Sequence, residues 1–397
     1  MTFSSTDQHD TPESRRYHRI QRRLSLADLG AGLVLLIVLL ATGWTGLLRD
    51  WAYHGARQNY AVALFFYVGM LSIVSTFLGL PLDFYGFRLE HRFHLSNQSF
   101  ASWVWDQIKS WVLTLILGAV LAEIIYFAIR RAPQHWWLIA WAVFVVLTVI
   151  FAQLAPVLLF PLFYKFAPLQ NDELKQRLVR LSERAGAHVH GVYEWKLSEK
   201  SKKANAALTG LSKTRRIILA DTLLQNYSPD EIESVLAHEL GHHVHRHMLK
   251  GIVVQIAVTF IGFWAASEVL RYAIDARHFF TALYDFANLP LLVLVSSVIS
   301  LLLMPAMNAW SRHNERQADR YCWQAIPSVQ PFISAMTRLA EQNLAEREPS
   351  RLAEIFFHSH PPIPQRIRAA LEFARAHGQQ ISAAGNSAND LLGAKIL

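Results

Sequence analysis

The stretch that decides the fold is residues 238–242, which read His-Glu-Leu-Gly-His. In a helix, His238 and His242 lie one turn apart on the same face, so both imidazoles can bind one metal ion. Glu239, one residue further on, is placed to polarise a water on that ion. Helix signals precede the motif, because Ser228-Pro229 offers a cap and a first-turn proline, and acidic residues follow. The sequence therefore predicts a helix that carries two zinc ligands and a general base.

A third ligand is expected elsewhere in the chain, because a catalytic zinc ion normally takes three protein ligands and keeps one position open. Glu315 is the first candidate. It lies four residues before Asp319, so the two carboxylates share a face of a helix, and one can bind the metal while the other orients a ligand histidine. Taken alone, the pair fits an ordinary charged helix face equally well. We expect one zinc ion per chain.

Composition indicates a membrane protein. The 397 residues are 52% hydrophobic and only 17% charged, below the usual quarter for soluble domains. The net charge of +8 is better explained by membrane topology than by nucleic acid, since no basic platform interleaved with aromatic residues is present. No nucleic-acid partner is expected. The single cysteine, Cys322, excludes an intrachain disulfide and a cysteine-based zinc site.

Six apolar stretches are close to the length of about 20 residues that a helix needs to cross a bilayer. Tryptophans and tyrosines lie near their ends, as in interfacial belts. Pro156, Pro161 and Pro305 are expected to kink or end their helices. The first stretch is too long for a signal peptide and has no convincing cleavage site after it. The predicted spans are residues 26–48, 60–82, 111–129, 136–163, 251–270 and 289–310.

The arrangement of charge predicts which side each part faces. Residues 1–23 form a polar tail with five arginines, which places the N-terminus in the cytoplasm. Six spans then put both termini and all candidate ligands on that side. The spans themselves are expected to be surrounded by membrane lipids. The expected order after the tail is four spans within 24–164, a cytoplasmic insert at 165–250, two spans within 251–310, a cytoplasmic part at 311–375 and a tail at 376–397.

The insert at 165–250 has the pattern of a small α+β domain. A helix is expected at 171–185, followed by three short strands at 191–196, 206–210 and 216–220. Residues 198–203 are polar and rich in lysine, so we expect a mobile loop there. His243, His245 and His247 follow the motif, either as a second metal site or as helix-face residues beside the membrane.

Glu123 lies well inside the third predicted span, where an ionisable group is costly. Two roles are open for it: lining a polar cavity between the helices, or pairing with Arg130 or Arg131 near the interface. Arg130 is two helical turns away, about 10 Å along the axis, so the cavity is favoured.

The chain resembles the type I CAAX prenyl protease family, the integral-membrane zinc endopeptidases with a His-Glu-x-x-His motif and a distant glutamate. The resemblance covers about residues 60 to 375 and rests on several separate blocks in the family's order. These blocks are 161–169, 203–210, 217–224, 238–242, 314–319, and 359–362 together with Arg366. It implies a bacterial member in the inner membrane, with its active site on the cytoplasmic side. It also implies that His238, His242 and Glu315 bind zinc and that Glu239 is the general base.

The resemblance assigns roles to four further residues. Asp319 is similar to the family's second acidic residue, treated as a proton donor or as a ligand-orienting group. Asn205 and His360 are similar to residues that approach the substrate carbonyl, where an amide and an imidazole suit a developing oxyanion. Arg366 matches a motif arginine of less defined role. Eukaryotic members have seven spans and this sequence six, so the shape of any chamber between the spans is open.

Together these observations predict a mainly α, polytopic membrane protein with a small zincin-like α+β domain that hydrolyses peptide bonds of membrane-associated or prenylated-type peptides. The peptide substrate is expected to add as a strand at 203–210. One alternative is a heat-shock-type quality-control zinc protease of broader specificity. A transporter or membrane scaffold with a vestigial site is another, against which the intact Glu239 and the third ligand argue.

Overall fold

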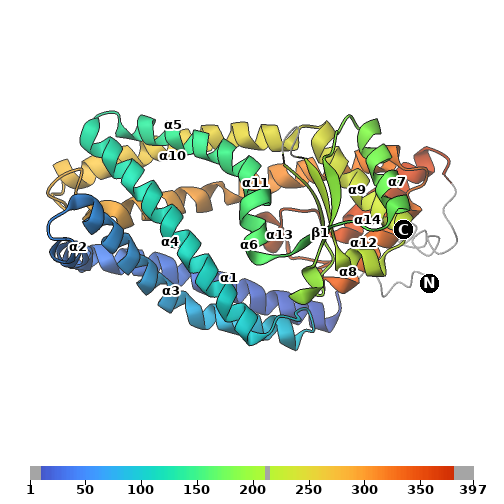
Figure 1. Cartoon of the computed structure of the whole chain (residues 1–397), viewed down its shortest axis with the longest axis horizontal. Helices are drawn as coiled ribbons and strands as arrows, with labels where there is room; N and C mark the ends of the chain where they lie inside the picture. The colour runs from blue at the N-terminus through green and yellow to red at the C-terminus, as the bar shows by residue number, and fades with distance from the viewer. Residues whose placement is uncertain (1–9, 211–214, 380–397) are drawn as a thin grey trace, which may run out of the picture.

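The computed structural model describes residues 10–210 and 215–379. The molecule is elongated (Figure 1): long helices run along its length, and a small sheet with short helices occupies one end. We call this end the α/β part. It comprises strands β1–β4 with helices α7–α9 and α12–α14.

Among the described residues, six helices are long and apolar enough to cross a membrane, which confirms the six predicted spans. Most of them extend several residues beyond the predicted apolar stretch, so they reach the α/β part without a flexible linker. They are α1 (Pro12–Ala41), α3 (Tyr60–Arg92), α4 (Phe100–Arg131), α5 (Trp136–Leu154) with its continuation to Phe163, α10 (His247–Asp275) and α11 (Leu289–Ala325).

The N-terminal segment differs from the prediction at both ends. Helix α1 begins at Pro12 behind the cap Thr11, so residues 12–23 are helical and not a loose polar tail. The first predicted span does not continue to residue 48. Gly43 adopts a left-handed conformation with φ of 74°, and a separate helix α2 (Trp44–Gly55) follows. The hydrophobic pattern of 26–48 gave no sign of this break.

Two of the predicted proline effects have different outcomes. Pro156 lies in a π-helical turn, Ala155–Leu159, after which α6 (Phe160–Phe163) leads out of the bundle. Pro305 does not end its helix, since α11 continues past it to Ala325. This continuity carries α11 from the membrane directly into the α/β part.

In the described part of the chain, the sheet has four strands in the order β1-β2-β4-β3. Strands β2 and β4 are parallel, whereas β1 and β3 pair antiparallel with their neighbours. The three predicted strands are confirmed, and β1 was missed because three residues give no readable alternation. The strands are β1 (Phe166–Pro168), β2 (Gly191–Trp195), β3 (Ala206–Thr209) and β4 (Arg216–Ala220). Strand β3 lies at one edge of the sheet, paired only with β4 in the described part.

One apolar core joins the sheet to the surrounding helices. Leu178, Leu219, Leu240 and Phe332 come from four different elements and are almost fully buried within it. This burial drives the packing of the α/β part. Its helices are α7 (Asp172–Arg184), α8 (Asp221–Asn226), α9 (Pro229–Val244), α12 (Gln330–Gln342), α13 (Arg351–Phe357) and α14 (Ile363–Ala376).

The long helices have a smaller core of their own, which includes Tyr67, Tyr126 and Phe286. Most of their apolar side chains face outward instead, such as Phe77 and Leu302, which are 71% and 74% exposed. An outer surface of this kind fits contact with lipid and not with water.

Residues 198–203 are not the mobile loop that their polarity predicted. Lys200 forms an ion pair with Asp106 on α4 at 2.5 Å, and Lys203 pairs with Glu90 on α3 at 2.9 Å. Ser198 Oγ donates to Asp221 at 2.6 Å. The lysines therefore tie this segment to the ends of two membrane helices.

Glu123 on α4 has a buried Oε1 atom without a hydrogen-bond partner. One turn on, Tyr126 is fully buried and its hydroxyl contacts Asn288 Oδ1 at 2.5 Å. The two interpretations of Glu123 stay predictions.

Because a buried polar atom without a partner is destabilising, Glu123→Leu should change the thermal unfolding midpoint and leave metal content unchanged. Loss of metal in this variant would contradict a role confined to the bundle.

Candidate metal centre

Helix α9, which carries the motif, is fixed at its first turn by a capping box. The backbone N–H of Glu231 donates to Ser228 Oγ at 3.3 Å, and the N–H of Ser228 donates to Glu231 Oε2 at 2.7 Å. Pro229 is the first helical residue, as predicted. The buried Glu231 also pairs with Arg338 on α12 at 3.0 Å. The start of α9 is therefore anchored to the α/β core.

A glycine inside the motif allows α9 to pack directly against α11. A Cβ atom on Gly241 would lie 2.7 Å from the Cα and 2.8 Å from the carbonyl oxygen of Ala318. Backbone atoms cannot move aside as a flexible side chain can, so only glycine permits this approach. The contact brings Glu315 on α11 opposite the two histidines.

The variant Gly241→Ala is expected to push the two helices apart. We expect a loss of about 1–3 kcal/mol of stability, typical of overpacking, together with a lower metal occupancy. Thermal unfolding and metal analysis would measure both effects. Gly262→Ala in α10 is the matched control, because its Cβ would meet nothing within 4 Å. Equal behaviour of the two variants would contradict the proposed helix contact.

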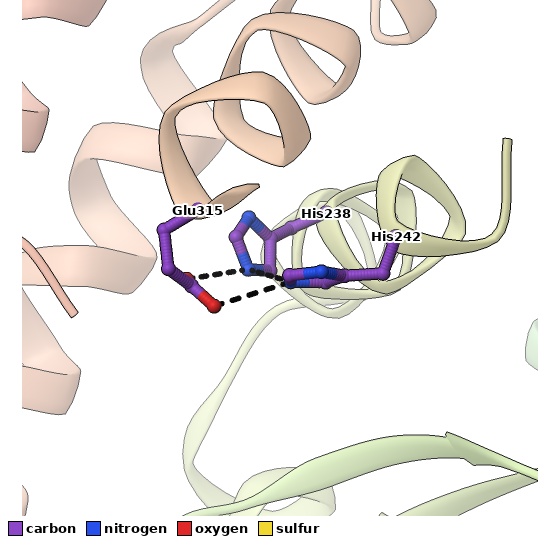
Figure 2. A group of neighbouring side chains, drawn as sticks. All are labelled: His238, His242 and Glu315. Atoms are coloured by element: carbon purple, nitrogen blue, oxygen red, sulfur yellow. Dashed lines mark hydrogen bonds and ion pairs between the residues drawn. The ribbon is translucent and has the colours of Figure 1, made fainter. Parts of the chain in front are cut away.

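The three predicted ligands converge on one point (Figure 2), and their ligand atoms all lie within 4.8 Å of one another. Glu315 Oε2 lies 3.2 Å from His238 Nε2, and Glu315 Oε1 lies 3.3 Å from His242 Nε2. The two Nε2 atoms are 3.3 Å apart. Two imidazoles and a carboxylate form a donor set that suits zinc.

Electrostatics at this point favour a cation. Burial alone would lower the pKa of His238, but its hydrogen bonds to Asp319 and Glu315 outweigh burial and raise its pKa to about 9. The buried Glu315 Oε2 lies 3.2 Å from His238 Nε2 and 2.8 Å from His360 Nδ1. A divalent ion between the carboxylate and the imidazoles would take the place of the proton on His238.

Behind His238 lies a buried pair of opposite charges. Asp319 Oδ1 lies 2.9 Å from His238 Nδ1, on the side of the ring away from the ligand atom Nε2. Arg366 holds the same carboxylate through two hydrogen bonds, at 2.6 and 2.8 Å. Burial would lower the pKa of Arg366, but Asp319 outweighs it and raises that pKa, so the arginine stays charged. The pair fixes the ring of His238 and leaves its Nε2 free for a metal.

Behind His242 lies a second group, which the sequence analysis did not assign to the site. His242 Nδ1 contacts His247 Nδ1 at 2.9 Å, and His247 Nε2 contacts Gln317 Oε1 at 2.9 Å. Since Gln317 Oε1 only accepts, His247 donates from Nε2 and accepts from His242 at Nδ1. His242 then carries its proton on Nδ1 and presents a free Nε2 to the metal.

Of the three histidines after the motif, His247 therefore supports the first site, and in the described part of the chain the three do not form a second one. Within residues 10–210 and 215–379, only His238, His242 and Glu315 form a group of three such side chains close enough to hold a metal. His247 is buried, unlike its neighbours. The spacing of five residues from His242 gave no signal, because the chain turns at Arg246, which has φ of 56° and separates α9 from α10.

Removal of His247 should weaken metal binding without removing a ligand. We expect His247→Phe to reduce metal affinity by about 10–100-fold, the usual effect of losing a partner of a ligand histidine. Competition with a metal indicator would measure it. His245→Phe is the control, since His245 stacks on His247 but makes no hydrogen bond to His242 in the described structure. An unchanged affinity in His247→Phe would refute this role.

The remaining predicted residues lie around the cluster at different distances. His360 Nδ1 is 2.8 Å from Glu315 Oε2, and the side chain is 62% exposed. Glu239 is half-buried on α9 beside His238. Asn205 is exposed directly before β3, and no hydrogen bond joins its side chain to the cluster among the described residues. The structure thus brings His360 to the metal ligands and leaves Asn205 at the open edge of the sheet.

Comparison with known proteins agrees with this architecture of a metal site joined to a membrane bundle. Residues 168–374 match the model of peptidase family M48. Residues 3–165 match the model described as the CAAX prenyl protease N-terminal region with five membrane helices, where the structure has four candidate spans and the shorter α2. The protein is an integral membrane metalloprotease, and it belongs to peptidase family M48.

Several relatives are similar along most of the chain. An uncharacterized metalloprotease, YhfN of Bacillus subtilis, is 30% identical over 90% of this chain and 84% of its own. CAAX prenyl protease 1 of Saccharomyces cerevisiae is 30% identical over 76% of this chain and 71% of its own. The crystal structure of S. mikatae Ste24p superposes with a TM-score of 0.82 at 25% identity, covering 93% of this chain and 91% of that one. The predicted family and fold are confirmed.

Proposed function

We propose that this protein is a zinc endopeptidase that cleaves membrane-associated or prenylated-type peptides, with its active site on the cytoplasmic side of a bacterial inner membrane. The observation that carries the proposal is the convergence of His238, His242 and Glu315 beside the open edge of the sheet. Helix α9 packs along the edge strand β3, so a peptide on that edge lies next to the ligands. The arginines at the start of α1 support the cytoplasmic orientation.

The residues of the site divide the chemistry among them. Zinc, when bound by His238, His242 and Glu315, supplies Lewis-acid chemistry that lowers the pKa of water and polarises a carbonyl. Glu239 takes the proton from the attacking water. Asp319 orients His238 from behind, which favours the ligand-orienting role over that of a proton donor.

Two further side chains are suited to the substrate carbonyl. The exposed His360 lies at the ligand cluster, and Asn205 precedes the strand on which the substrate would lie. Hydrogen bonds from an imidazole and an amide would stabilise the negative charge that develops on the carbonyl oxygen. Arg366 acts at one remove, by holding Asp319.

The substrate would bind as an added strand. In the described part, β3 pairs with β4 along one side, and the backbone groups of its other side are available for an extended peptide. An added strand would extend the sheet beyond β3. It would place the peptide backbone alongside β3 and next to α9. This geometry supports the predicted binding at 203–210.

The relatives favour a lipid-modified substrate over the heat-shock alternative, because the yeast protein is named a CAAX prenyl protease and is similar over most of both chains. The test compares a farnesylated peptide with the same peptide lacking the lipid, on purified protein in detergent or vesicles. We expect the farnesylated peptide to be cleaved with the higher kcat/KM. Chelation should abolish cleavage, and added zinc should restore it.

Three outcomes of this test separate the possibilities. Equal cleavage of the two peptides would reject the lipid preference and favour a protease of broader specificity. If activity returned only with a metal other than zinc, the assignment of zinc would be rejected. Absence of cleavage by protein with full metal content would reject the peptidase assignment to this site.

A further inference from the structure

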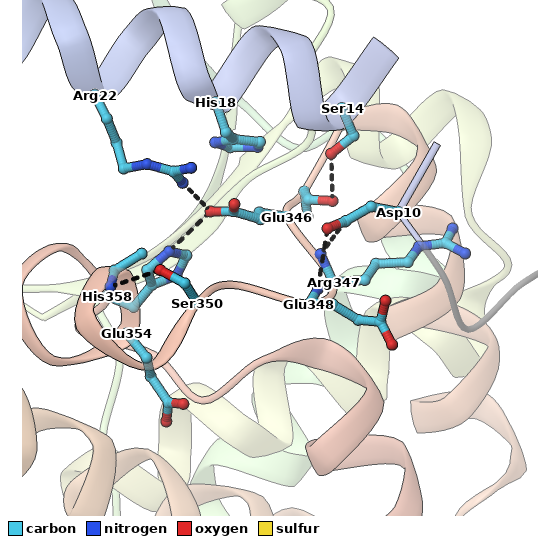
Figure 3. A network of polar contacts seen from close by, with 12 residues as sticks. Asp10, Ser14, His18, Arg22, Glu346, Arg347, Glu348, Ser350, Glu354 and His358 are labelled. Carbon is cyan, nitrogen blue, oxygen red and sulfur yellow. Dashed lines mark hydrogen bonds and ion pairs between the residues drawn. The ribbon is translucent and has the colours of Figure 1, made fainter. Parts of the chain in front are cut away.

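Ser14, His18 and Arg22 follow one another at intervals of four in the first turns of α1, and Asp10 lies just before the helix cap Thr11. The spacing of four places the three helical residues along one face of α1. Asp10 and Ser14 are buried, so the face is not a solvated one. Figure 3 shows that the face lies against the segment between α12 and α13, far away in sequence. We call this segment, residues 343–350, the α12–α13 loop.

Each of the four side chains contacts the α12–α13 loop (Figure 3). The carboxylate of Asp10 accepts hydrogen bonds from the backbone N–H groups of residues 347 and 348, at 2.5 and 3.3 Å. Ser14 Oγ lies 3.1 and 3.0 Å from the carbonyl oxygens of residues 344 and 345. His18 Nε2 contacts the carbonyl of residue 344 at 2.7 Å, and Arg22 forms an ion pair with Glu346.

Glu346 extends this contact toward the metal site. Its side chain is only 5% exposed, and Oε2 faces both Arg22 and, at 3.2 Å, His358 Nε2. The backbone carbonyl of His358 accepts a further hydrogen bond from Arg312 on α11 at 2.7 Å. His358 is thus held by side chain and by backbone, two residues before His360.

His360 needs such support, because its side chain is 62% exposed and packing does not fix it. On its other side the chain continues through Pro361-Pro362 into α14, and α14 is anchored by Arg366 to Asp319. Prolines restrict the backbone to few conformations. The position of His360 is therefore set by two anchors, one at His358 and one at the start of α14.

We propose that Arg22 and Glu346 are positioning residues of this protease, which act through His358 to hold His360 at the metal site. The polar face of α1 then acts on the site only through the α12–α13 loop and His358. The inference rests on the proposed role of His360 at the substrate carbonyl. A buried carboxylate that loses its cationic partner is destabilised, so without Arg22 the side chain of Glu346 should leave its position. His358 would then lose the contact that holds it.

The test uses Arg22→Gln in the full-length protein, with Arg23→Gln as the matched control. Arg23 is an exposed neighbour on the same helix, and its replacement removes the same charge. We expect Arg22→Gln to lower kcat about 10–100-fold, the scale of a misplaced catalytic group, with little change in KM or metal content. Arg23→Gln should keep the wild-type kcat. A wild-type kcat in Arg22→Gln would overturn the proposal.

A double-mutant cycle distinguishes positioning from general destabilisation. In a His360→Ala background, Arg22→Gln should have no further effect on kcat, because its target is already gone. Independent, multiplying effects would overturn the proposal, and so would a wild-type kcat in His360→Ala alone.

A readout without activity separates this inference from the proposed function. Amide hydrogen exchange in residues 344–360 should be faster in Arg22→Gln than in Arg23→Gln. Equal exchange would reject the contact as an anchor even in an active enzyme. Faster exchange in a protein without peptidase activity would reject the proposed function and leave the anchor in place.

Discussion

Replacement of Glu239 by glutamine is expected to remove nearly all peptide hydrolysis while the metal and the fold remain. The amide cannot take a proton from water, and general acid–base groups typically contribute about 10²–10⁴-fold to the rate. His238, His242 and Glu315 stay in place, so metal content should equal that of the wild type. Peptide cleavage and metal analysis on the same preparation would show both results. Residual turnover near the wild-type rate would mean that another group acts as the base.

Replacement of Glu315 by alanine should have a different consequence, because it removes one of the three proposed ligands. We expect the metal to be lost, or bound far more weakly, and activity to disappear with it. The buried carboxylate also holds His238 and faces His360, so the site should lose order as well as affinity. Glu239→Gln serves as the control, since it is inactive but keeps every ligand. Full metal occupancy in Glu315→Ala would point to another ligand, with His313 and His360 the first to examine.

The central site could be predicted because its chemistry depends on short-range spacing. Residues four apart on a helix share a face, which placed His238 with His242 and Glu315 with Asp319 without any knowledge of the fold. The predicted cap Ser228 and the first-turn proline Pro229 indicated the start of the helix in the same way. The contact between α9 and α11 could not be predicted from spacing alone. The sequence feature that permits it is Gly241 inside the motif, but its role is visible only in the structure, where it packs against the backbone of Ala318.

Features that depend on distant partners escaped prediction. His247 supports His242 only because the chain reverses at Arg246, and no local pattern indicates that turn. The lysines of 198–203 looked solvated because their acidic partners lie on α3 and α4, about a hundred residues earlier. The arginines of α1 were interpreted as a topology signal alone, whereas Arg22 pairs with Glu346 at the other end of the sequence. In each case tertiary contacts override local polarity.

The unbroken course of α11 fixes the distance between Glu315 and the end of the apolar stretch of this helix. Glu315 lies five residues beyond Trp310, the aromatic residue at the end of the apolar stretch. At 1.5 Å per residue this is about 7–8 Å along the helix axis. Because no hinge separates Trp310 from Glu315, this distance along the helix is constant. An extended peptide rises about 3.3 Å per residue, so a lipid-anchored chain would meet the metal about two or three residues from its anchor. Peptides lengthened one residue at a time beside the anchor should therefore be cut at bonds that shift in step.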